Sequence, residues 1–438
     1  MNKAVVWVVV AALIVCAWFQ VITRRPDDHA AALASLRTQI DDALALNLPK
    51  RTIPLYLQAI SYAPRDLQWR TGLADAYQAL GDTMAYRDVL VQANADFPED
   101  VPTGVRLLKY WVDGGQCQNA VHGYEGFAPN VQADAQAKAL FWQCAWKYVS
   151  YSDGRYTWIG SLSGGHFPMK LGSMYGYLGS KGGMVIPALY QAVRPYIDGW
   201  AAVQSENNWF YLDEDGDRIL AFPGESPTDA YSFSEGYAPI LLDGSWRYID
   251  KNSREYGADL ALQDARPFAN KVAPVKRDGK WGLIDQEFAF VVNPVYDDIA
   301  CAESGVCTAS GRLVAQTGGA WRVYDLEGKQ IGQDAYDAAS SFQEGVSAVK
   351  KGAEWSSIDA SGAVLATYTC DEARPLYQGV WPVRVGTEWK YVTTEGEDAG
   401  EGRWTDAANV SRGGTAVVSA PAEDDQSYRV IQFYRFMK

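Results

Sequence analysis

The stretch Lys280-Trp281-Gly282-Leu283-Ile284-Asp285 sets a large aromatic residue at the start of a short apolar run that ends in an acidic residue. Apolar and aromatic residues bounded by turn formers are typical of a β-strand of about five residues. The run Val291–Ile299 that follows is again β-branched and aromatic, with Pro294 and Tyr296 inside it. The local pattern therefore indicates short strands joined by tight turns.

An aromatic residue followed by an apolar strand recurs along the C-terminal part of the chain. These aromatic anchors are Tyr175, Trp209, Trp246, Trp281, Trp321, Trp355, Trp389 and Tyr428, at intervals of 34, 37, 35, 40, 34, 34 and 39 residues. Near-constant spacing is the sequence signature of a repeat architecture, in which each unit buries its apolar face against its neighbours. We therefore predict that the anchors form the core between repeats rather than a ligand site.

The segment 280–299 resembles the WG (or KWG) repeat of bacterial surface and envelope proteins, and the resemblance extends over about residues 170–438. Only the copy at Trp281 keeps the Trp-Gly pair. The resemblance implies an all-β repeat domain, which we place at residues 153–438. Three or four strands per repeat favour a propeller of seven or eight blades, since a closed ring hides its sheet edges. The alternative is an open coil of β-hairpins. We expect Tyr428–Phe436 to close a ring alongside Tyr156–Ile159.

Residues 27–152 show helical periodicity and a second repeat, of 34 residues. Leu73 recurs as Leu107 and Gly81 as Gly115, and Ala59 and Pro64 recur in the same way. This pattern resembles the tetratricopeptide motif, in which small residues let two helices approach and Gly and Pro end them. The resemblance implies about three units over residues 33–134, followed by a helix over 133–148. Thr52 and Tyr86 occupy positions where that family has a small residue, which predicts splayed helix pairs.

The N-terminal residues predict a membrane anchor. From Ala4 to Ile22 the chain is apolar apart from Gln20 and carries no charge. Residues 4–23 suffice to span a bilayer at ~1.5 Å per residue. We therefore assign residues 1–26 to an uncleaved signal anchor in the inner (plasma) membrane. A short head and a large C-terminal body favour a periplasmic body, although Lys3 and the pair Arg24-Arg25 nearly balance the flanking charge.

Composition and motifs exclude several classes of function. The net charge of −14 argues against a nucleic-acid partner, because phosphate binding needs clustered Lys and Arg. The three histidines do not have the spacing of metal ligands. The carboxylates Asp213, Asp215 and Asp217 lack the remaining ligand positions of an EF-hand, and we interpret them as a hairpin turn. We expect no catalytic residue, no cofactor and no metal.

The cysteines bear on topology. An exported body would meet an oxidising compartment, where suitably placed pairs form disulfides. The 34-residue frame brings Cys117 and Cys144 to the ends of adjacent antiparallel helices, and Cys301 and Cys307 flank a short loop. This leaves Cys370 free and Cys16 in the lipid. The alternative is that all six are isolated thiols in a cytoplasmic body.

The sequence therefore predicts a membrane-anchored, non-catalytic scaffold of the bacterial cell envelope that binds other proteins. The alternative is a binder of cell-wall or surface glycan through aromatic residues of the repeats. Solvent-facing aromatic pairs would favour glycan, whereas exposed mixed apolar patches would favour protein partners.

Overall fold

The computed structural model describes residues 26–151, 156–222, 226–420 and 427–436. The chain divides into a helical unit that ends at Ala145 and a β-unit that begins at Trp146. The predicted boundary at 152/153 lies too late, because residues 148–150 form a strand of the β-unit. Within the described ranges, no helix is long and apolar enough to cross a membrane. The predicted anchor at residues 4–23 lies outside these ranges.

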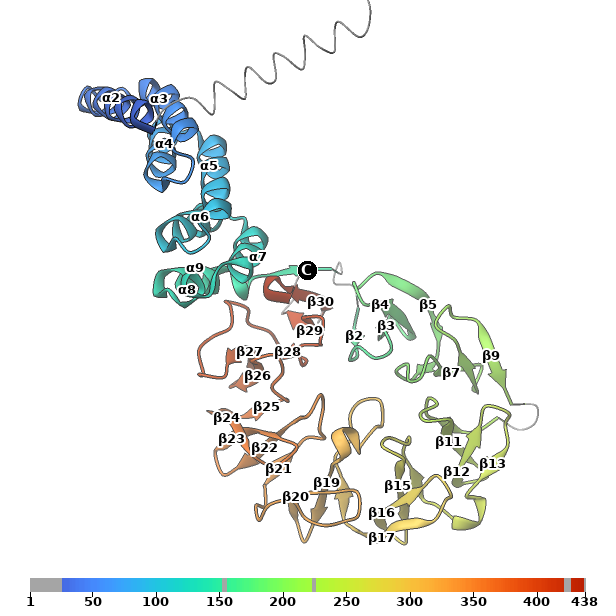
Figure 1. The fold of residues 1–438 in the computed structure, drawn as a ribbon. Helices are drawn as coiled ribbons and strands as arrows, with labels where there is room; N and C mark the ends of the chain where they lie inside the picture. Colours follow the sequence, from blue (N-terminus) through green and yellow to red (C-terminus); the bar gives the residue numbers. More distant parts are fainter. Residues whose placement is uncertain (1–25, 152–155, 223–225, 421–426, 437–438) are drawn as a thin grey trace, which may run out of the picture. The chain divides into compact units, whose positions relative to one another are not determined.

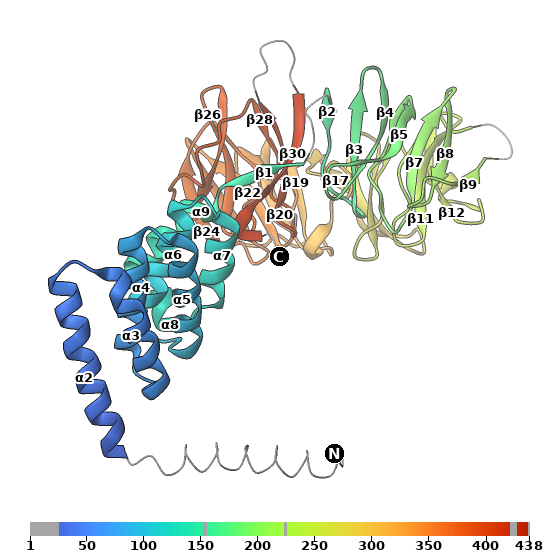
Figure 2. The same ribbon diagram turned by 90° about the horizontal axis from the view of Figure 1, so that it is seen from above.

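The helical unit is a succession of antiparallel helices (Figure 2). They are α2 (Pro26–Ala45), α3 (Pro49–Tyr62), α4 (Leu67–Leu80), α5 (Thr83–Asp96), α6 (Val101–Asp113), α7 (Cys117–Gly126), α8 (Pro129–Ala133) and α9 (Ala135–Ala145). The last of these is shorter than the predicted helix over 133–148. Aspartates begin three of them: the side chains of Asp66, Asp82 and Asp100 accept hydrogen bonds from backbone amides of the first turn of α4, α5 and α6.

The 34-residue repeat corresponds to pairs of these helices. Leu73 in α4 and Leu107 in α6 are both buried in the core. Gly81 follows α4 and Gly115 follows α6, and both adopt the left-handed conformation that ends a helix, with φ of 71° and 68°. Thr52, at a position predicted to splay a helix pair, is fully buried and donates to the carbonyl of Pro49. The helical unit is therefore built from tetratricopeptide-like pairs.

The described residues of the β-unit form eight antiparallel sheets, which are the blades of a propeller (Figure 1). Blades 1 and 2 consist of β2 (Trp158–Ile159), β3 (His166–Leu171), β4 (Met174–Gly179), β5 (Met184–Tyr190), and of β6 (Ala192–Val193), β7 (Ala201–Ser205), β8 (Asn208–Leu212), β9 (Arg218–Ala221). Blades 3 and 4 consist of β10 (Asp229–Ala230), β11 (Tyr237–Leu242), β12 (Ser245–Asp250), β13 (Glu255–Tyr256), and of β14 (Asp264–Ala265), β15 (Val272–Arg277), β16 (Lys280–Asp285), β17 (Phe290–Tyr296).

The other four blades repeat this plan. Blades 5 and 6 consist of β18 (Asp298–Ile299), β19 (Leu313–Thr317), β20 (Ala320–Tyr324), and of β21 (Ala338–Ala339), β22 (Val346–Lys351), β23 (Glu354–Asp359), β24 (Val364–Thr369). Blade 7 consists of β25 (Glu372–Ala373), β26 (Val380–Val385) and β27 (Glu388–Thr393). Blade 8 consists of β28 (Asp406–Ala407), β29 (Thr415–Ala420), β30 (Ser427–Phe433) and β1 (Tyr148–Ser150). Of the predicted alternatives, a propeller of seven or eight blades or an open coil of β-hairpins, the structure is the eight-bladed propeller.

Two-residue turns fix the register of the central hairpin in blades 1 to 7. Only two residues join β11 to β12 and β15 to β16, and both turns are Asp-Gly. In each turn both residues have positive φ, for example 52° at Asp243 and 77° at Gly244. This geometry matches the right-handed twist of the strands and favours Asp-Gly.

The ring closes between its two chain ends. β1 pairs antiparallel with β30, so that Val149 lies opposite Gln432. The N-terminal strand of the β-unit therefore supplies the outer edge of the last blade. The predicted closing partner, Tyr156–Ile159, contributes a single bridge between Tyr156 and Tyr428. Trp158 and Ile159 of this segment form β2, which begins blade 1 instead.

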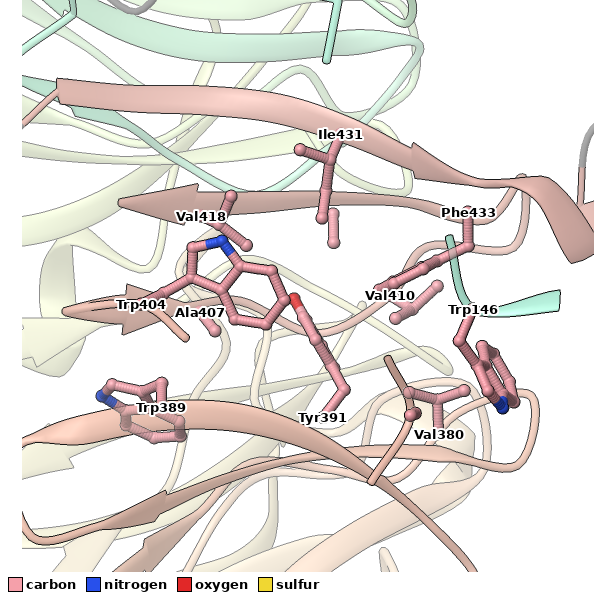
Figure 3. Close-up of a cluster of buried hydrophobic side chains, with 12 residues drawn as sticks. Trp146, Val380, Trp389, Tyr391, Trp404, Ala407, Val410, Val418, Ile431 and Phe433 are labelled. Carbon is pink, nitrogen blue, oxygen red and sulfur yellow. The ribbon is translucent and has the colours of Figure 1, made fainter. Parts of the chain in front are cut away.

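The core of the closing blade is rich in aromatic residues (Figure 3). Phe433 is fully buried, and its ring lies edge-on to Trp146 at a centroid distance of 5.9 Å and to Tyr391 at 5.3 Å. Trp404 packs into the same cluster. Aromatic pairs of this geometry add stabilisation beyond their buried area. The closure consequently rests on an apolar core as well as on the strand pairing.

Candidate functional site

The aromatic anchors all lie in the third strand of their blades. Five of them have side chains that are only 4–7 % exposed, namely Trp209, Trp246, Trp281, Trp355 and Trp389. The other three, Tyr175, Trp321 and Tyr428, are partly buried. None of the eight is therefore a freely exposed aromatic platform.

Each buried anchor contacts the following blade. Trp281 of blade 4 packs in one cluster with Ile299 and Leu313 of blade 5. The indole nitrogens of Trp209 and Trp355 donate to carbonyls just before the next inner strand, at 3.3 and 3.2 Å. The anchors thus join neighbouring repeats. The ring faces that a glycan would stack on are covered by the next blade.

Arginines near the inner strands connect consecutive blades through polar contacts. Arg194 of blade 2 donates to Asp229 (2.6 Å) and to the carbonyl of Ala230 (3.1 Å) in blade 3. Arg374 of blade 7 makes the same pair of contacts with Asp406 (2.7 Å) and Ala407 (2.6 Å) in blade 8. These ion pairs are about one third exposed, so each adds less than ~1 kcal/mol to stability. Their main effect is to orient neighbouring blades.

The centre of the ring holds two adjoining cavities, with volumes of about 440 and 520 Å³. The first, which we call the inner cavity, is lined by the inner-strand residues of blades 1, 6, 7 and 8. The second, the loop-side cavity, is lined mainly by the connections between the inner and second strands of blades 1, 2, 5, 6 and 8. The carboxylates of the inner cavity are already engaged: Glu303 accepts from the Ser161 amide, Glu372 from Arg384, and Asp406 from Tyr428.

With this geometry established, a comparison with protein-family models identifies the repeat. The model described as "WG containing repeat" matches residues 175–209, 228–246, 246–281, 281–309 and 321–355. The five matched segments are WG repeats. Each match runs from one aromatic anchor to the next or covers part of that interval. Blades 7 and 8 lie beyond the matched residues but share the strand plan of the WG repeats.

Solved structures give only a distant likeness. Hsv2 of Kluyveromyces lactis is 8 % identical, with a TM-score of 0.36, and the match covers 64 % of this chain and 97 % of that one. Apo AztD of Citrobacter koseri is 10 % identical, with a TM-score of 0.38, and the match covers 63 % of this chain and 88 % of that one. The second TPR domain of human RPAP3, in complex with an HSP70 peptide, is 14 % identical, with a TM-score of 0.23. That match covers 26 % of this chain and 94 % of that one. No curated protein matches the sequence.

The predicted hairpin turn at Asp213 recurs through the WG repeats. The side chain of Asp213 accepts hydrogen bonds from the backbone amides of Asp215 and Asp217. Equivalent aspartates close the same turn in four other blades: Asp250, Asp285, Asp325 and Asp359. No group of three potential metal ligands occurs in the part of the chain that the structure describes.

This turn predicts an acid-sensitive contribution to stability. Hydrogen bonds from the Ser361 hydroxyl and from the amides of Ser361 and Ala363 lower the pKa of Asp359 from its ordinary value of 3.8. Because the folded-state pKa lies below that of the unfolded chain, the ionised carboxylate stabilises the fold above pH ~4 and loses this effect as the pH falls through the folded-state pKa. We expect Asp359→Asn to weaken the loss of urea resistance between about pH 7 and pH 3. Identical pH profiles for the variant and the parent would contradict this.

The candidate disulfide cysteines lie in pairs. Cys117, the first residue of α7, is bonded to Cys144 near the end of α9, with Cα atoms 4.9 Å apart. Cys301 is bonded to Cys307, with Cα atoms 4.0 Å apart. Cys370 is a free thiol whose burial raises its pKa to about 11. Cys16 lies outside the described residues. Oxidation of the two pairs in the cell stays a prediction, because it depends on export.

The helical unit exposes large aliphatic side chains at one end. Leu44, Leu46 and Leu48 surround the α2–α3 turn, and Leu80 and Met84 flank the α4–α5 turn; they are 37–68 % exposed. Helices joined by such short connections run antiparallel, so both turns lie at the same end. We call these five residues the apolar end.

Two features of the site were not predicted from the sequence. One is the apolar end, since an exposed leucine in a helical repeat cannot be told from a buried one without knowing how neighbouring units stack. The other is a long connection in blade 5. The 40-residue interval between Trp281 and Trp321 was its only signal.

Proposed function

We propose that this protein is a membrane-anchored, non-catalytic scaffold of the bacterial cell envelope, whose helical unit binds protein partners through the apolar end. The observation that carries the proposal is the set of exposed aliphatic side chains at two helix turns on the same end of the unit, Leu44, Leu46, Leu48, Leu80 and Met84. Exposed apolar patches on folded proteins mark contact surfaces. The engaged carboxylates of the inner cavity support a binding role over catalysis.

A protein partner is favoured over a glycan by the kind of apolar side chain that is exposed. Glycan recognition needs aromatic faces, yet the anchors of the WG repeats are partly or fully buried between blades. Among large apolar residues of the described ranges, Trp142 and Tyr148 are the exposed aromatics, and the rest are aliphatic. Aliphatic groups provide contact area without the directional stacking that sugars use.

Membrane attachment rests on the uncharged run of residues 4–23. The first described helix, α2, begins at Pro26 and has 20 residues, or a length of ~30 Å. The apolar end lies at the far end of this helix. A single-pass anchor with a periplasmic body would therefore hold the apolar end about 30 Å along α2 from the residues next to the bilayer, where partners can reach it.

The partner surface is tested by substitution in the full chain. We compare Leu46→Asp/Met84→Asp with the control Gln39→Asp/Gln78→Asp, which adds the same acidic residues at exposed polar positions of α2 and α4. Each protein is purified from solubilised membranes after cross-linking in cells, and co-purifying proteins are quantified by mass spectrometry. We expect specific partners to be lost from the first variant and kept by the control. Equal recovery from both variants would contradict the proposed surface.

Anchoring and orientation are tested separately. The native chain should stay with membranes after alkaline extraction, and a chain that begins at residue 27 should be released. Peptide mapping without reduction should find Cys117 joined to Cys144 if the body is exported. A fully reduced pair would place the body on the cytoplasmic side, whatever the result for the apolar end.

A further inference from the structure

One connection in the ring is about twice as long as its counterparts. The inner strand and the second strand of each blade are joined by six or seven residues, except in blade 5, where residues 300–312 form a connection of 13 residues. In Figure 1 this segment, which precedes β19, projects into the middle of the ring. We call it the channel loop. It contains the Cys301–Cys307 disulfide.

The second half of the channel loop is fixed to neighbouring blades. Cys307 and Thr308 are fully buried, and Cys307 packs in the same cluster as Trp281. The hydroxyl of Thr308 donates to the carbonyl of Ala269 (2.9 Å), and Asn270 donates to the carbonyl of Thr308 (2.8 Å). The amide of Gly345 in blade 6 donates to Ser310 at 3.0 Å. This half therefore belongs to the core between blades 4, 5 and 6.

The first half, residues 302–306, is a small turn that reaches the opposite side of the ring. Glu303 at its tip accepts a hydrogen bond from the backbone amide of Ser161 in blade 1, at 2.7 Å. Gly160 makes this approach possible, because a side chain there would collide with the Glu303 carboxylate. The turn is held by hydrogen bonds within it, between Ala302, Gly305 and Val306, and by the disulfide.

This tip lies between the two central cavities. Seven residues line both cavities: Ser161, Ala302, Glu303, Gln343, Ala408, Asn409 and Val417. Two hydrogen bonds join members of this set across the ring, one from Ser161 to Glu303 and one from Asn409 to Gln343, at 2.8 Å. The tip of the channel loop is thus part of the partition between the inner cavity and the loop-side cavity.

We propose that the Cys301–Cys307 disulfide is a redox-sensitive latch that holds the tip of the channel loop in this partition, and that its reduction opens passage between the two cavities. A disulfide restricts the conformations of the loop it closes, and a short turn without it gains freedom. The proposal goes beyond the partner surface on the helical unit and does not depend on it.

The reductant has a route to this disulfide. Cys301 lines the inner cavity, whereas Cys307 is fully buried. One thiolate of a small dithiol attacks the Cys301 sulfur, and Cys307 leaves and takes up a proton; the second thiol of the dithiol then releases Cys301 as a thiol. The dithiol becomes a cyclic disulfide, and two electrons and two protons pass to the protein. Cys117 and Cys144 are both buried, which makes that disulfide the internal control.

The latch is tested by amide hydrogen–deuterium exchange on the full chain in detergent. Four forms are compared: oxidised protein, protein treated with a mild dithiol until alkylation shows Cys301 and Cys307 reduced and Cys117–Cys144 intact, the variant Cys301→Ser/Cys307→Ser, and Glu303→Ala with its disulfide intact. We expect exchange in residues 160–165, which include the Ser161 amide, to rise about ten-fold in the last three forms. In the reduced protein it should fall again on reoxidation. Exchange in β11 and β12 should not change.

Two outcomes would overturn the proposal. If exchange at residues 160–165 is equally slow with and without the disulfide, the tip stays seated by its other contacts and the disulfide is no latch. If β19 and β20 also exchange rapidly after reduction, the disulfide stabilises the whole of blade 5 and is structural. Neither outcome bears on the apolar end, which is tested by its own variants.

Discussion

Replacing Trp281 by alanine is expected to lower the free energy of unfolding of the β-unit by about 3–5 kcal/mol, the usual cost of truncating a large buried aromatic side chain. Trp281 is 4 % exposed and packs against Leu313 and Cys307 of the next blade. The guanidinium of Arg266 and the amine of Lys276 lie over its ring, at 5.3 and 5.7 Å. The alanine variant leaves a cavity between blades 4 and 5.

The loss should spread beyond the substituted blade, because stability in a repeat array depends on interfaces between neighbours. Equilibrium urea unfolding, followed by the β-strand signal in circular dichroism, measures the change. The matched variant is Trp321→Ala, which truncates an anchor that is only partly buried and should cost less. If Trp281→Ala unfolds at nearly the same urea concentration as the parent protein, the anchors do not form the core between blades. The glycan alternative then gains support.

Phe433→Ala is expected to have an effect of the same size, about 3–5 kcal/mol, but at the closure of the ring. Phe433 is fully buried in β30 and contacts Trp146 and Tyr391 (Figure 3). Its loss should weaken the last blade and loosen β1, which pairs with β30.

Amide exchange in residues 148–150 and 427–433 should therefore rise together in Phe433→Ala, while blades 3 and 4 keep their protection. The conservative variant Phe433→Leu keeps most of the volume and should cost less than about 1.5 kcal/mol. Exchange that stays slow in residues 148–150 of the alanine variant would show that β1 is held independently of this core.

Much of this fold is predictable from the sequence because each repeat is marked by residues that determine the structure close to them in the chain. The anchors mark the third strand of every blade, and Gly81 and Gly115 mark helix ends that require a left-handed residue. The number of blades and the closing partner are not local properties. β1 has only three residues, Tyr148–Ser150, and lacks an anchor, so its pairing is decided by the geometry of the closed ring.

Less of the candidate site can be predicted from the sequence. The exposure of Leu46 and Met84 depends on how helices stack, and the position of Glu303 depends on a loop that crosses the ring. The cysteine pairs can be put forward because helix period and short spacing bring their Cα atoms close. The sequence predicts the membrane anchor at residues 4–23, which lies outside the described residues.

Closure of the eight-bladed ring is the central claim, and a cross-strand disulfide tests it most directly. Val149 and Gln432 face each other in the β1–β30 pair, and opposed residues of antiparallel strands lie within bridging range at ~4.5–5.5 Å. The full chain carrying Val149→Cys/Gln432→Cys should form this bridge, found by peptide mapping without reduction. Val149→Cys/Val430→Cys, a diagonal pair of the same two strands at ~7–8 Å, should not. A folded Val149→Cys/Gln432→Cys protein with both new thiols free to alkylate would contradict the closed ring and favour the open coil.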